Sequence, residues 1–367
     1  MKCLFVVFNF GSGGAEHVLV NFLKYNASCK NPWNISVFAQ DDRGELKDDF
    51  YKYANVITLK KTPSFLKKII LNSSLLLNFF IFKKKSFDVS IAYLEGGPAK
   101  TVMMLKKTSK KIAWIHTDIS FFSKKIKKRY YKIYNSYNDI AFVSKDIKEK
   151  FKKVYPELAM KNLTILHNPI DFEKIRKSSA EIPDNLRLKD GEFIVISVGR
   201  FSQEKGMDRV IEIAKKLKNY PIRFLLIGTG IEFEKIKNEV EMNKLKNVSL
   251  LGYKQNPFCY VRLSDLYLLP SRREGYPTCL CEALALNKPI FSSNCTGAKE
   301  VLSSAGQIFE NDDSSFVEKV CLSLINIINN KSEYDDLVLK SIERSKDFDY
   351  EKKMENMRNY IWTGENE

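Results

Sequence analysis

The sequence predicts an α/β protein with two doubly wound domains in tandem, and three observations support this fold class. The length of 367 residues exceeds the usual size of a single hydrophobic core. The composition, 44% hydrophobic and 28% charged, is that of a globular protein. Apolar strand-like runs alternate with stretches of helical periodicity in both halves, which indicates βαβ crossovers and parallel sheets. Ligands are therefore expected beyond the carboxyl ends of the strands, in a cleft where the two domains face each other.

Five strands are expected in each half of the chain. In the first half they are Leu4–Phe8, Ile35–Phe38, Val89–Ala92, Ile112–Ile115 and Ile140–Val143. In the second half they are Ile194–Val198, Phe224–Ile227, Val248–Leu251, Leu266–Leu269 and Pro289–Ser292. Stretches with helical spacing, such as Met207–Lys218, separate them.

The join between the domains is expected near Asn168, because a residue that precedes proline disfavours helix and a turn follows at Pro169. We therefore predict a first domain over residues 1–170 and a second domain over residues 171–346. Residues 347–367 carry apolar side chains at helical spacing, so they are predicted to form a terminal helix that packs back on the first domain.

Composition also bears on compartment and cofactors. No apolar run reaches the roughly 18 to 20 residues needed to span a bilayer, and the first seven residues are expected to form a buried strand rather than a targeting segment. Seven cysteines without a Cys-x-x-Cys spacing indicate core thiols in a reducing compartment. Three scattered histidines are too few for a metal cluster. We expect a cytoplasmic protein without a metal or other cofactor.

The excess positive charge is confined to the first half of the chain. Residues 1–170 carry 30 Lys and Arg against 13 Asp and Glu, a net charge of +17, whereas the remainder carries 30 against 31. A basic half beside a neutral half indicates that one domain faces a polyanion or an anionic membrane, where a well-placed lysine contributes roughly 1 kcal/mol.

Two segments of this basic half stand apart. Residues 65–82 are rich in Leu, Ile and Phe, but Asn and Ser interrupt them, so they are too polar to cross a membrane. Residues 121–131 interleave aromatic and basic side chains and can lie on lipid headgroups. The basic residues concerned are Lys124, Lys125, Lys127, Lys128 and Arg129. The alternative is an ordinary amphipathic helix with a solvated basic face.

The segment from Glu274 to Glu282 is the most informative part of the sequence. Positions eight apart lie about 80° apart around one helix, so a loop must carry the first glutamate. Gly275 permits close backbone approach, and Pro277 suits the first position of a helix that begins near Pro277 or Thr278. The unpaired N–H groups of that helix start suit a phosphate. Glu282 can accept hydrogen bonds from ribose hydroxyls, and Glu274 is expected at the mouth of the site, beside a sugar. The alternative is a capped surface helix with two solvated glutamates.

Arg200 and Lys205 follow the expected strand Ile194–Val198 and precede a helix. At that edge of the sheet, a guanidinium fork and an ammonium group can together neutralise a diphosphate. Because negative charge develops on a departing nucleoside diphosphate, such cations also lower the barrier to breaking the glycosidic bond. Taken alone, an Arg and a Lys five residues apart are more often surface charges.

Two further positions lie at strand ends of the first half. The glycines around Gly14 follow the first strand and allow close approach of a ligand, although they do not complete the Gly-x-Gly-x-x-Gly pattern. His116 follows the expected strand Ile112–Ile115, and both a structural role and contact with a substrate are open for it.

Together these motifs resemble the retaining glycosyltransferases of family four, which have the GT-B fold of two Rossmann-like domains facing across a cleft. The motifs span nearly the whole chain in the family's order and spacing. The matching pieces are the Gly11 to Glu16 turn, His116, Asn168–Pro169, Gly199–Arg200 with Lys205–Gly206, and Glu274–Gly275–Tyr276–Pro277 through Glu282–Ala283–Leu284–Ala285. Where the family usually has glycine, this chain has Asn287, the next-best residue for a left-handed helix end. Residues 292–300 loosely resemble members that use UDP-sugars.

The resemblance implies four catalytic residues, namely Glu274, His116, Arg200 and Lys205. It implies a donor site formed by Gly14, Arg200, Lys205, Glu274, Gly275, Tyr276, Pro277, Thr278 and Glu282. In that site Arg200 and Lys205 bind the diphosphate and Glu282 binds the ribose, while His116 lies near the acceptor. The leaving phosphate would take the proton of the acceptor hydroxyl, so neither a dedicated base nor a metal is required.

The sequence thus favours a retaining glycosyltransferase that moves a hexose or N-acetylhexosamine from a UDP-sugar to a lipid-linked, lipopolysaccharide or capsule glycan. The expected location is the inner face of the cell membrane, with peripheral association. The expected partners are the nucleotide sugar, the glycan acceptor and an anionic membrane, but no nucleic acid. Two alternatives stay open: a nucleotide-sugar epimerase of the same fold, and a nonenzymatic basic protein that binds membranes or nucleic acid.

Overall fold

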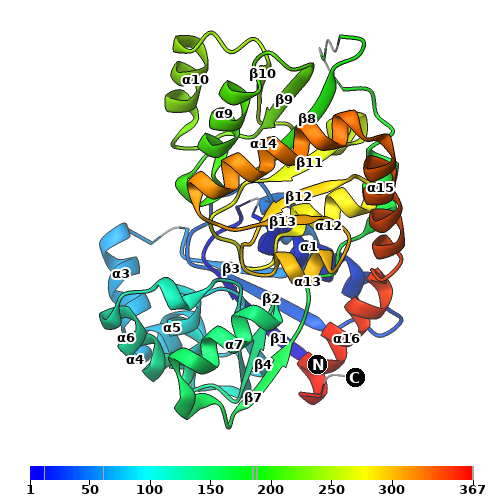
Figure 1. Ribbon diagram of the computed structural model, residues 1–367. Coiled ribbons are helices and arrows are strands. Elements are labelled where there is room, and N and C mark those ends of the chain that lie inside the picture. Colours follow the sequence, from blue (N-terminus) through cyan, green and yellow to red (C-terminus); the bar gives the residue numbers. More distant parts are fainter. Residues whose placement is uncertain (12, 61, 184–185, 187–188, 366–367) are drawn as a thin grey trace. The chain divides into compact units, whose positions relative to one another are not determined.

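The computed structural model divides into two compact units (Figure 1). It describes residues 1–11, 13–60, 62–183, 186 and 189–365, so Ser12 of the glycine turn lies outside the described residues. The first unit consists of Met1–Pro169 and Glu351–Glu367, and the second unit is Ile170–Tyr350.

The first unit is built on a seven-stranded parallel sheet in the order β3-β2-β1-β4-β5-β6-β7. Its strands are β1 (Lys2–Val7), β2 (Asn34–Ala39), β3 (Asn55–Thr58), β4 (Phe87–Ala92), β5 (Thr108–Ile115), β6 (Asp139–Phe142) and β7 (Asn162–Ile165). In β1, every residue from Cys3 to Val7 is buried, as expected for a central parallel strand with helices on both faces of its sheet.

Helices connect successive parallel strands of this unit, as βαβ crossovers require. They are α1 (Gly14–Ser28), α2 (Lys47–Tyr53), α3 (Ser64–Asn72), α4 (Ser74–Leu76), the π turn η1 (Leu77–Ile81), α5 (Gly97–Met104), η2 (Ile119–Phe121), α6 (Lys124–Tyr134), α7 (Lys145–Val154), η3 (Pro156–Leu158) and α16 (Tyr350–Thr363). From Glu351 on, α16 belongs to the first unit. Its Arg358 Nη2 donates to the carbonyl of Asn31 at 2.5 Å, and Tyr360 and Ile361 are fully buried.

The second unit contains a six-stranded parallel sheet in the order β10-β9-β8-β11-β12-β13. Its strands are β8 (Phe193–Val198), β9 (Ile222–Ile227), β10 (Val248–Gly252), β11 (Leu266–Leu269), β12 (Ile290–Ser293) and β13 (Gln307–Phe309). Its helices are α8 (Phe172–Ser178), η4 (Gln203–Lys205), α9 (Met207–Lys216), α10 (Phe233–Met242), α11 (Phe258–Leu263), α12 (Thr278–Ala285), α13 (Ala298–Leu302), α14 (Asp313–Asn329) and α15 (Lys331–Ser345). The core joins α9 and α14 to the strands through residues such as Ile213, Phe224 and Phe316.

In both sheets the order of strands reverses beside the first strand of the unit. That strand is β1, next to β4, in the first unit and β8, next to β11, in the second. In doubly wound sheets, the loops that leave the carboxyl ends of such a strand pair diverge to opposite faces and open a ligand crevice. The strand order therefore marks two places where bound ligands are expected.

All ten predicted strands are present, and the structure adds β3, β7 and β13 to them. These three lie at edges of the sheets. An edge strand is covered on fewer sides, so it tolerates polar residues, and β3 (NVIT) and β7 (NLTI) accordingly lack the continuous apolar run that revealed the others.

No single helix among the described residues is long and apolar enough to cross a membrane. Two consecutive helical stretches, Ser64–Asn72 and Ser74–Ile81, are together long and apolar enough to cross one, but the chain bends by 101° between them.

Candidate functional site

The loops that follow β8 and β11 are neighbours at the strand-order reversal of the second sheet, because these two strands pair directly. The β8–α9 loop carries Arg200 and Lys205, and the β11–α12 loop carries Glu274. The structure thus brings together, within one unit, residues about 70 positions apart in the chain that the sequence analysis assigned to one donor site.

Lys205 and Glu274 form a largely buried ion pair between these loops. Lys205 Nζ donates to Glu274 Oε1 at 2.7 Å and to Oε2 at 2.8 Å, and Ser271 Oγ donates to Oε1 at 2.7 Å. Only 9% of the Glu274 side chain and 24% of the Lys205 side chain are exposed. Burial alone lowers the pKa of Lys205, but the Glu274 carboxylate outweighs it and raises that pKa above its ordinary value. Lys205 is therefore a cation at neutral pH.

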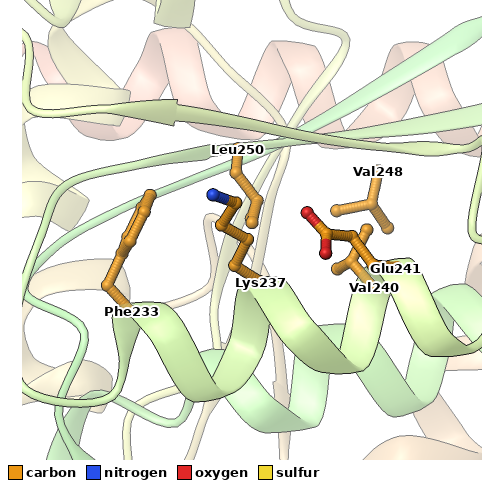
Figure 2. Close-up of a pocket in the computed structure, with 6 residues that line it drawn as sticks. All are labelled: Phe233, Lys237, Val240, Glu241, Val248 and Leu250. Atoms are coloured by element: carbon orange, nitrogen blue, oxygen red, sulfur yellow. The ribbon is translucent and has the colours of Figure 1, made fainter.

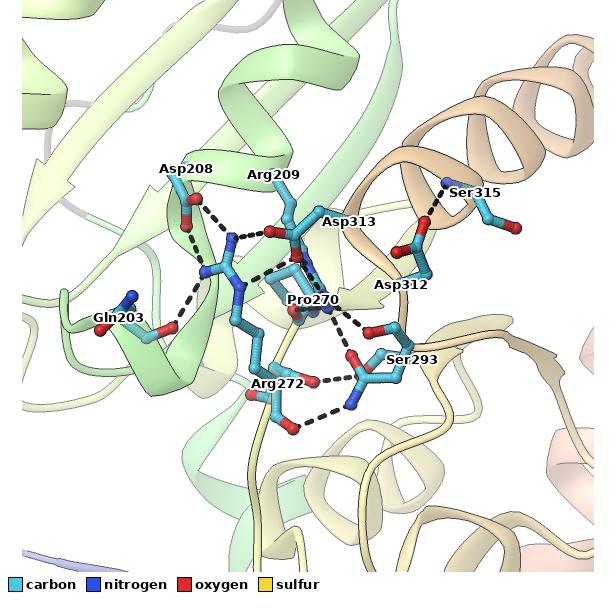
Figure 3. A network of polar contacts seen from close by, with 11 residues as sticks. Gln203, Asp208, Arg209, Pro270, Arg272, Ser293, Asp312, Asp313 and Ser315 are labelled. Carbon is cyan, nitrogen blue, oxygen red and sulfur yellow. Dashed lines mark hydrogen bonds and ion pairs between the residues drawn. The ribbon is translucent and has the colours of Figure 1, made fainter. Parts of the chain in front are cut away.

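A network of charged side chains fixes the two loops relative to each other (Figure 3). Arg272, in the β11–α12 loop, donates to Asp208 Oδ1 at 2.8 Å and Oδ2 at 2.6 Å in the first turn of α9. Its Nε also donates to Asp313 Oδ1 at 3.0 Å, at the start of α14. The backbone amide of Arg272 donates to the carbonyl of Glu204 at 2.7 Å. The hydrogen bonds to Asp208 hold the pKa of Arg272 above its usual range.

The buried Arg209 extends the network beneath Arg272. It is 2% exposed, and it donates to Asp313 Oδ1 at 2.7 Å, to Asn311 Oδ1 at 2.7 Å and to the carbonyl of Pro270 at 3.0 Å. Asn311 Nδ2 in turn donates to the carbonyl of Arg272 at 2.8 Å. Arg209 thus joins α9 to the β11–α12 loop at Pro270 and to the segment between β13 and α14 at Asn311 and Asp313, which supports the β11–α12 loop from below.

Two glycines permit the close backbone approach that the loops require. Gly206 has φ +67°, and a Cβ atom there would lie 2.3 Å from the carbonyl oxygen of Pro270. Gly297, in the loop between β12 and α13, has φ +80°, and its Cβ would lie 2.8 Å from the carbonyl oxygen of Gly275. A side chain at either position would push the neighbouring loop away.

Helix α12 begins at Thr278 with Pro277 at the N-cap position, which confirms the predicted helix start. Tyr276, immediately before it, is buried. Glu282 lies just over one turn into the helix and is half-buried. Burial raises the pKa of Glu282 to about 7, with Lys205 acting in the opposite direction. The helix ends before Asn287, whose φ of +56° is the left-handed conformation predicted for it.

Arg200 lies in the same loop as Lys205, with an exposed side chain. Hydrogen bonds from its own backbone amide and from Ser202 lower the pKa of Glu204, and the charge of Arg200 adds to them. The same charge acts against the raised pKa of Lys205. The loop therefore presents one shielded cation and one solvated cation.

The first unit carries its own polar cluster at the ends of β4 and β5. His116 follows β5, and its backbone amide donates to Glu95 Oε1 at 2.6 Å, while the amide of Thr117 donates to the same oxygen at 2.8 Å. The imidazole lies 4.7 Å from the ring of Tyr93, and its buried Nε2 has no hydrogen-bond partner among the described residues. Burial lowers the pKa of His116 to about 3, so the ring is neutral at physiological pH.

Gly14 is the first residue of α1, directly beyond β1, and the N-cap residue Gly13 offers no capping side chain. The amides of this helix start are thus placed at the strand-order reversal of the first sheet, where the glycine turn was predicted.

The basic residues predicted to meet a membrane lie on α6. Lys124, Lys125, Lys128 and Arg129 are exposed, whereas Lys127 is half-buried and its Nζ donates to the carbonyl of Ser120 at 2.6 Å. Ser123 caps the helix by accepting from the amide of Ile126 at 3.4 Å. Four of the five cations are therefore available to a partner.

An open pocket of about 420 Å³ lies elsewhere in the second unit, between α10 and the edge strand β10 (Figure 2). It is lined by Phe233, Lys237, Val240, Glu241, Val248 and Leu250. None of the residues predicted to bind a donor lines this pocket, so it is separate from the candidate site. Within the described residues, no group of three or more His, Cys, Asp or Glu side chains is placed to hold a metal ion.

Sequence reasoning missed Glu95, Ser271 and Arg272. Ser271 and Arg272 adjoin Glu274 in the chain, and their position directly after a predicted strand was the available signal. Glu95 likewise follows β4, but a carboxylate that accepts hydrogen bonds from amides just beyond the next strand has no local sequence signature.

Comparison with known proteins relates the second unit, which contains the Lys205–Glu274 pair, to glycosyltransferases. Residues 178–337, which lie within the second unit, match the family described as Glycosyl transferases group 1. An uncharacterized glycosyltransferase of Haemophilus influenzae is 26% identical over 98% of this chain and 99% of that protein. A second uncharacterized glycosyltransferase, from Methanocaldococcus jannaschii, is 30% identical over 53% of this chain and 56% of that protein.

A third relative has an assigned reaction. The N-acetylgalactosamine-N,N'-diacetylbacillosaminyl-diphospho-undecaprenol 4-alpha-N-acetylgalactosaminyltransferase of Campylobacter jejuni is 29% identical over 44% of this chain and 42% of that protein. The chain thus spans about half the length of two of these three relatives and nearly all of the other.

Solved structures establish the fold. The Anabaena protein HepE, in complex with UDP and glucose, superposes with a TM-score of 0.75 at 16% identity over 98% of this chain and 99% of that chain. The lipopolysaccharide outer core galactosyltransferase WaaB superposes with a TM-score of 0.69 at 20% identity over the full length of both chains. The predicted GT-B fold, with two parallel-sheet α/β domains, is confirmed.

Proposed function

We propose that this protein is a retaining glycosyltransferase that moves a hexose or N-acetylhexosamine from a UDP-sugar to a lipid-linked or surface-polysaccharide acceptor. The observation that carries the proposal is the Lys205–Glu274 pair at the strand-order reversal of the second sheet. Glycosyl transfer is supported by the family match of residues 178–337 and by the relative of nearly equal length. The UDP-bound neighbour supports the choice of nucleotide, and the Campylobacter relative supports a lipid-linked acceptor.

The diphosphate of the donor is bound by the β8–α9 loop and the start of α12. Arg200 supplies an exposed guanidinium and Lys205 an ammonium group, which together neutralise the charge that develops on the leaving nucleotide. The amides of Thr278 and Cys279 at the start of α12 add the positive end of the helix dipole. These groups provide a positive field at the phosphates, so the transfer needs no metal ion.

Glu274 and Glu282 hold the two sugars of the donor. Glu282 accepts hydrogen bonds from the two ribose hydroxyls, which favours its ionised form on binding. Glu274 lies beside the transferred sugar, and its pairing with Lys205 fixes its carboxylate in one orientation. Gly275 and Tyr276, which follow Glu274 in the chain, complete the donor site.

In the chemical step, the acceptor hydroxyl oxygen forms a bond to the anomeric carbon while the bond from that carbon to the UDP oxygen breaks. Attack occurs on the face from which UDP departs, and the hydroxyl proton passes to a phosphate oxygen of UDP. His116 contacts the acceptor as a neutral imidazole, because its pKa near 3 leaves the ring uncharged and able to exchange hydrogen bonds.

A donor screen by calorimetry tests the proposal. We expect UDP to bind more tightly than GDP and ADP, and Lys205→Ala to weaken UDP binding at least tenfold, about 1.4 kcal/mol. Lys237→Ala, which removes a lysine of the separate pocket, is the matched control and should bind UDP like the wild type. Tight binding of GDP without binding of UDP would refute the uridine assignment.

Two alternatives are separated by activity measurements. An epimerase would consume the UDP-sugar without an acceptor, whereas the transferase requires one. A nonenzymatic basic protein would keep its function in Glu282→Ala and lose it when the cations of α6 are neutralised. The transferase should lose activity in Glu282→Ala and keep it, with a soluble acceptor, when the cations of α6 are neutralised. Its activity should also fall severely in Arg200→Ala or Lys205→Ala.

A further inference from the structure

The first unit displays an exposed apolar ridge on α3, α4 and η1, the chain from Ser64 to Ile81. Figure 1 labels α3 and α4. Six large apolar side chains on it are exposed, from 38% for Leu66 to 69% for Leu75. They are Phe65, Leu66, Ile69, Leu75, Phe79 and Phe80. These three elements contact one another, and exposed apolar side chains gathered on neighbouring elements of a folded unit mark a contact with a partner or a membrane.

The ridge is held firmly from beneath. Ile70 and Leu77 are buried on the inner side of the segment. Asn78 Nδ2 donates to the carbonyl of Met104 at 2.9 Å, and Ser74 Oγ donates to the same carbonyl at 2.9 Å. The amide of Lys106 donates to Asn78 Oδ1 at 3.1 Å. The polar residues that interrupt the apolar run in the sequence thus attach the segment to the end of α5 and leave its apolar residues facing outward.

Lysines lie on the ridge and in the chain directly after it. Residues 50–87 contain eight lysines and no aspartate or glutamate. Lys68 on α3 and Lys83, Lys84 and Lys85 after η1 are exposed. Lys83 Nζ lies 4.4 Å from the centre of the Phe79 ring, and Lys107 Nζ donates to the carbonyl of Lys83 at 3.0 Å. The ridge and its cations therefore form one surface, with charge complementary to an anionic layer.

The basic helix α6 packs against α5. Lys100 of α5 forms a hydrogen bond with Asn72 at the end of α3. Burial lowers the pKa of the same Lys100, and the nearby charge of Arg129 on α6 lowers it further. The cations of α6 thus extend the basic rim, but the large exposed apolar residues are concentrated on α3 to η1.

We propose that the α3 to η1 ridge inserts into an anionic lipid bilayer as the membrane anchor of this protein, with the surrounding lysines at the headgroups. Interfacial segments of this type bind through buried apolar area together with attraction to anionic lipid, and lysine stems accompany their charged ends to the headgroup level. The inference rests on the proposed function in one respect, the membrane-bound acceptor, and assigns insertion to a segment other than α6.

Vesicle flotation of the full-length chain tests the anchor. We expect binding to vesicles of phosphatidylcholine with phosphatidylglycerol, weaker binding to phosphatidylcholine alone, and at least about tenfold weaker partition for Phe79→Ser/Phe80→Ser. The control is Leu322→Ser/Leu339→Ser, which removes two leucines of the second unit that are 69% and 61% exposed. This control should float like the wild type.

A tryptophan substitution reports insertion directly and does not depend on loss of binding. In Phe80→Trp, brominated lipid should quench the added fluorescence relative to wild type, and the emission should shift to the blue. Circular dichroism and UDP calorimetry on each variant show that it is folded, and they separate a failed anchor from a failed nucleotide assignment. If the wild-type protein binds UDP but does not float with vesicles, only the membrane anchor is refuted. If it floats but does not bind UDP, only the donor assignment is refuted.

Three outcomes would overturn the proposal. The wild-type protein does not float with anionic vesicles; or the Phe79/Phe80 variant floats unchanged while neutralising Lys124, Lys125, Lys128 and Arg129 abolishes binding; or sedimentation velocity shows a dimer that the Phe79/Phe80 substitution dissociates. The second outcome assigns the membrane surface to α6, and the third assigns the ridge to a second copy of this chain.

Discussion

Lys205 Nζ contacts both carboxylate oxygens of Glu274, at 2.7 Å and 2.8 Å, across the two loops that meet at the strand-order reversal of the second sheet. The cation proposed for the donor diphosphate is therefore already paired before a donor binds. A diphosphate must share or redirect this ammonium group, which couples nucleotide binding to the orientation of the glutamate beside the sugar. Ser271 Oγ donates to the same carboxylate at 2.7 Å, so Glu274 has a second partner besides Lys205.

Replacing Lys205 should affect donor binding and stability together. Lys205→Met leaves a 9% exposed carboxylate without its cation, and we expect the second unit to lose about 2–3 kcal/mol of stability. We also expect at least tenfold weaker UDP binding. Scanning calorimetry and UDP titration measure the two effects.

The double variant Lys205→Met/Glu274→Gln separates the two effects. Removing the orphaned charge should restore most of the stability, because the pair then leaves no buried ion, but UDP binding should stay weak. Recovery of both properties would show that Lys205 acts only as the partner of Glu274 and not on the phosphates.

Arg272 should act as a positioning residue for Lys205 and Glu274. Arg272→Ala removes the bidentate contact with Asp208 and the bond to Asp313, and we expect about 2–3 kcal/mol of destabilisation. The exposed Arg262 provides the control, since Arg262→Ala should change stability by less than about 0.5 kcal/mol.

The two loops should also separate in Arg272→Ala, so UDP affinity should fall although Arg272 is not proposed to contact the nucleotide. In Arg272→Lys, the single ammonium group cannot span Asp208 and Asp313, and affinity should recover only in part. Wild-type UDP binding in Arg272→Ala would contradict the positioning role.

The arrangement of the fold was readable from the sequence to a large extent. Ten of the strands could be predicted from continuous apolar runs such as Phe224–Ile227, because parallel strands are buried on both faces of the sheet. The edge strands β3 and β7 escaped this pattern, since their half-exposed residues are not required to be apolar, and β13 is only three residues long. The helix limits at Thr278 and Asn287 were predictable because proline and left-handed residues leave a local signature.

The candidate site was predictable only as a set of residues. Position after a strand identified Arg200, Lys205 and Glu274, but the pairing of Lys205 with Glu274 spans 69 residues and depends on which strands are neighbours. The Arg272–Asp208–Asp313 network was not predictable for the same reason. The exposed ridge of α3 to η1 was missed as a surface, because an apolar run in a sequence does not reveal which of its residues face outward.

Glu282 should make UDP binding dependent on pH. A carboxylate that accepts ribose hydroxyls binds best when ionised, and burial raises its pKa to about 7, so affinity should fall as the pH drops through 7. We expect roughly tenfold weaker binding at pH 6 than at pH 8 by calorimetry. UDP itself titrates near this range, so the same measurement on Glu282→Gln gives the part of the pH dependence that comes from UDP. Parallel profiles for the two proteins would exclude ionisation of Glu282 as the cause.

The same group should make stability depend on pH in the opposite sense. Because the pKa of Glu282 in the folded state lies above that in the unfolded state, the protonated carboxyl is favoured by folding, and its contribution is present below about pH 4.5 and lost as the pH rises through 7. Glu282→Gln should therefore gain up to about 3 kcal/mol relative to wild type between pH 4.5 and pH 8. Denaturation at both pH values checks this difference.

Asn287 offers a stabilising substitution. Its φ is +56°, and its buried Oδ1 has no hydrogen-bond partner among the described residues. Asn287→Gly should raise stability by about 0.5–1 kcal/mol, because glycine adopts this conformation without strain and leaves no buried acceptor. Asn287→Ala should instead destabilise by about 1 kcal/mol. Thermal unfolding that ranks Ala above Gly would contradict the left-handed helix end.

His116 should lower the stability of the first unit in acid. Burial holds its pKa at about 3 when folded, whereas in the unfolded chain it is about 6.5. Between these values the unfolded state binds a proton that the folded state does not, so stability falls with decreasing pH by up to about 1.4 kcal/mol per pH unit. Glu95, which accepts from the His116 amide, has a raised pKa and opposes this trend, but it is present in wild type and variant alike.

The comparison of wild type with His116→Phe isolates the histidine. The phenyl ring keeps the contact with Tyr93 and cannot titrate, so the variant should lose about 2 kcal/mol less than wild type between pH 7 and pH 5. Trp33, Trp114 and Trp362 all belong to the first unit, so tryptophan fluorescence during urea denaturation follows that unit alone. UDP binding should be unchanged in His116→Phe, because the proposed donor residues of the second unit are intact, while transfer to an acceptor should fall. Superimposable pH profiles for the two proteins would mean that His116 is not held neutral in the folded state.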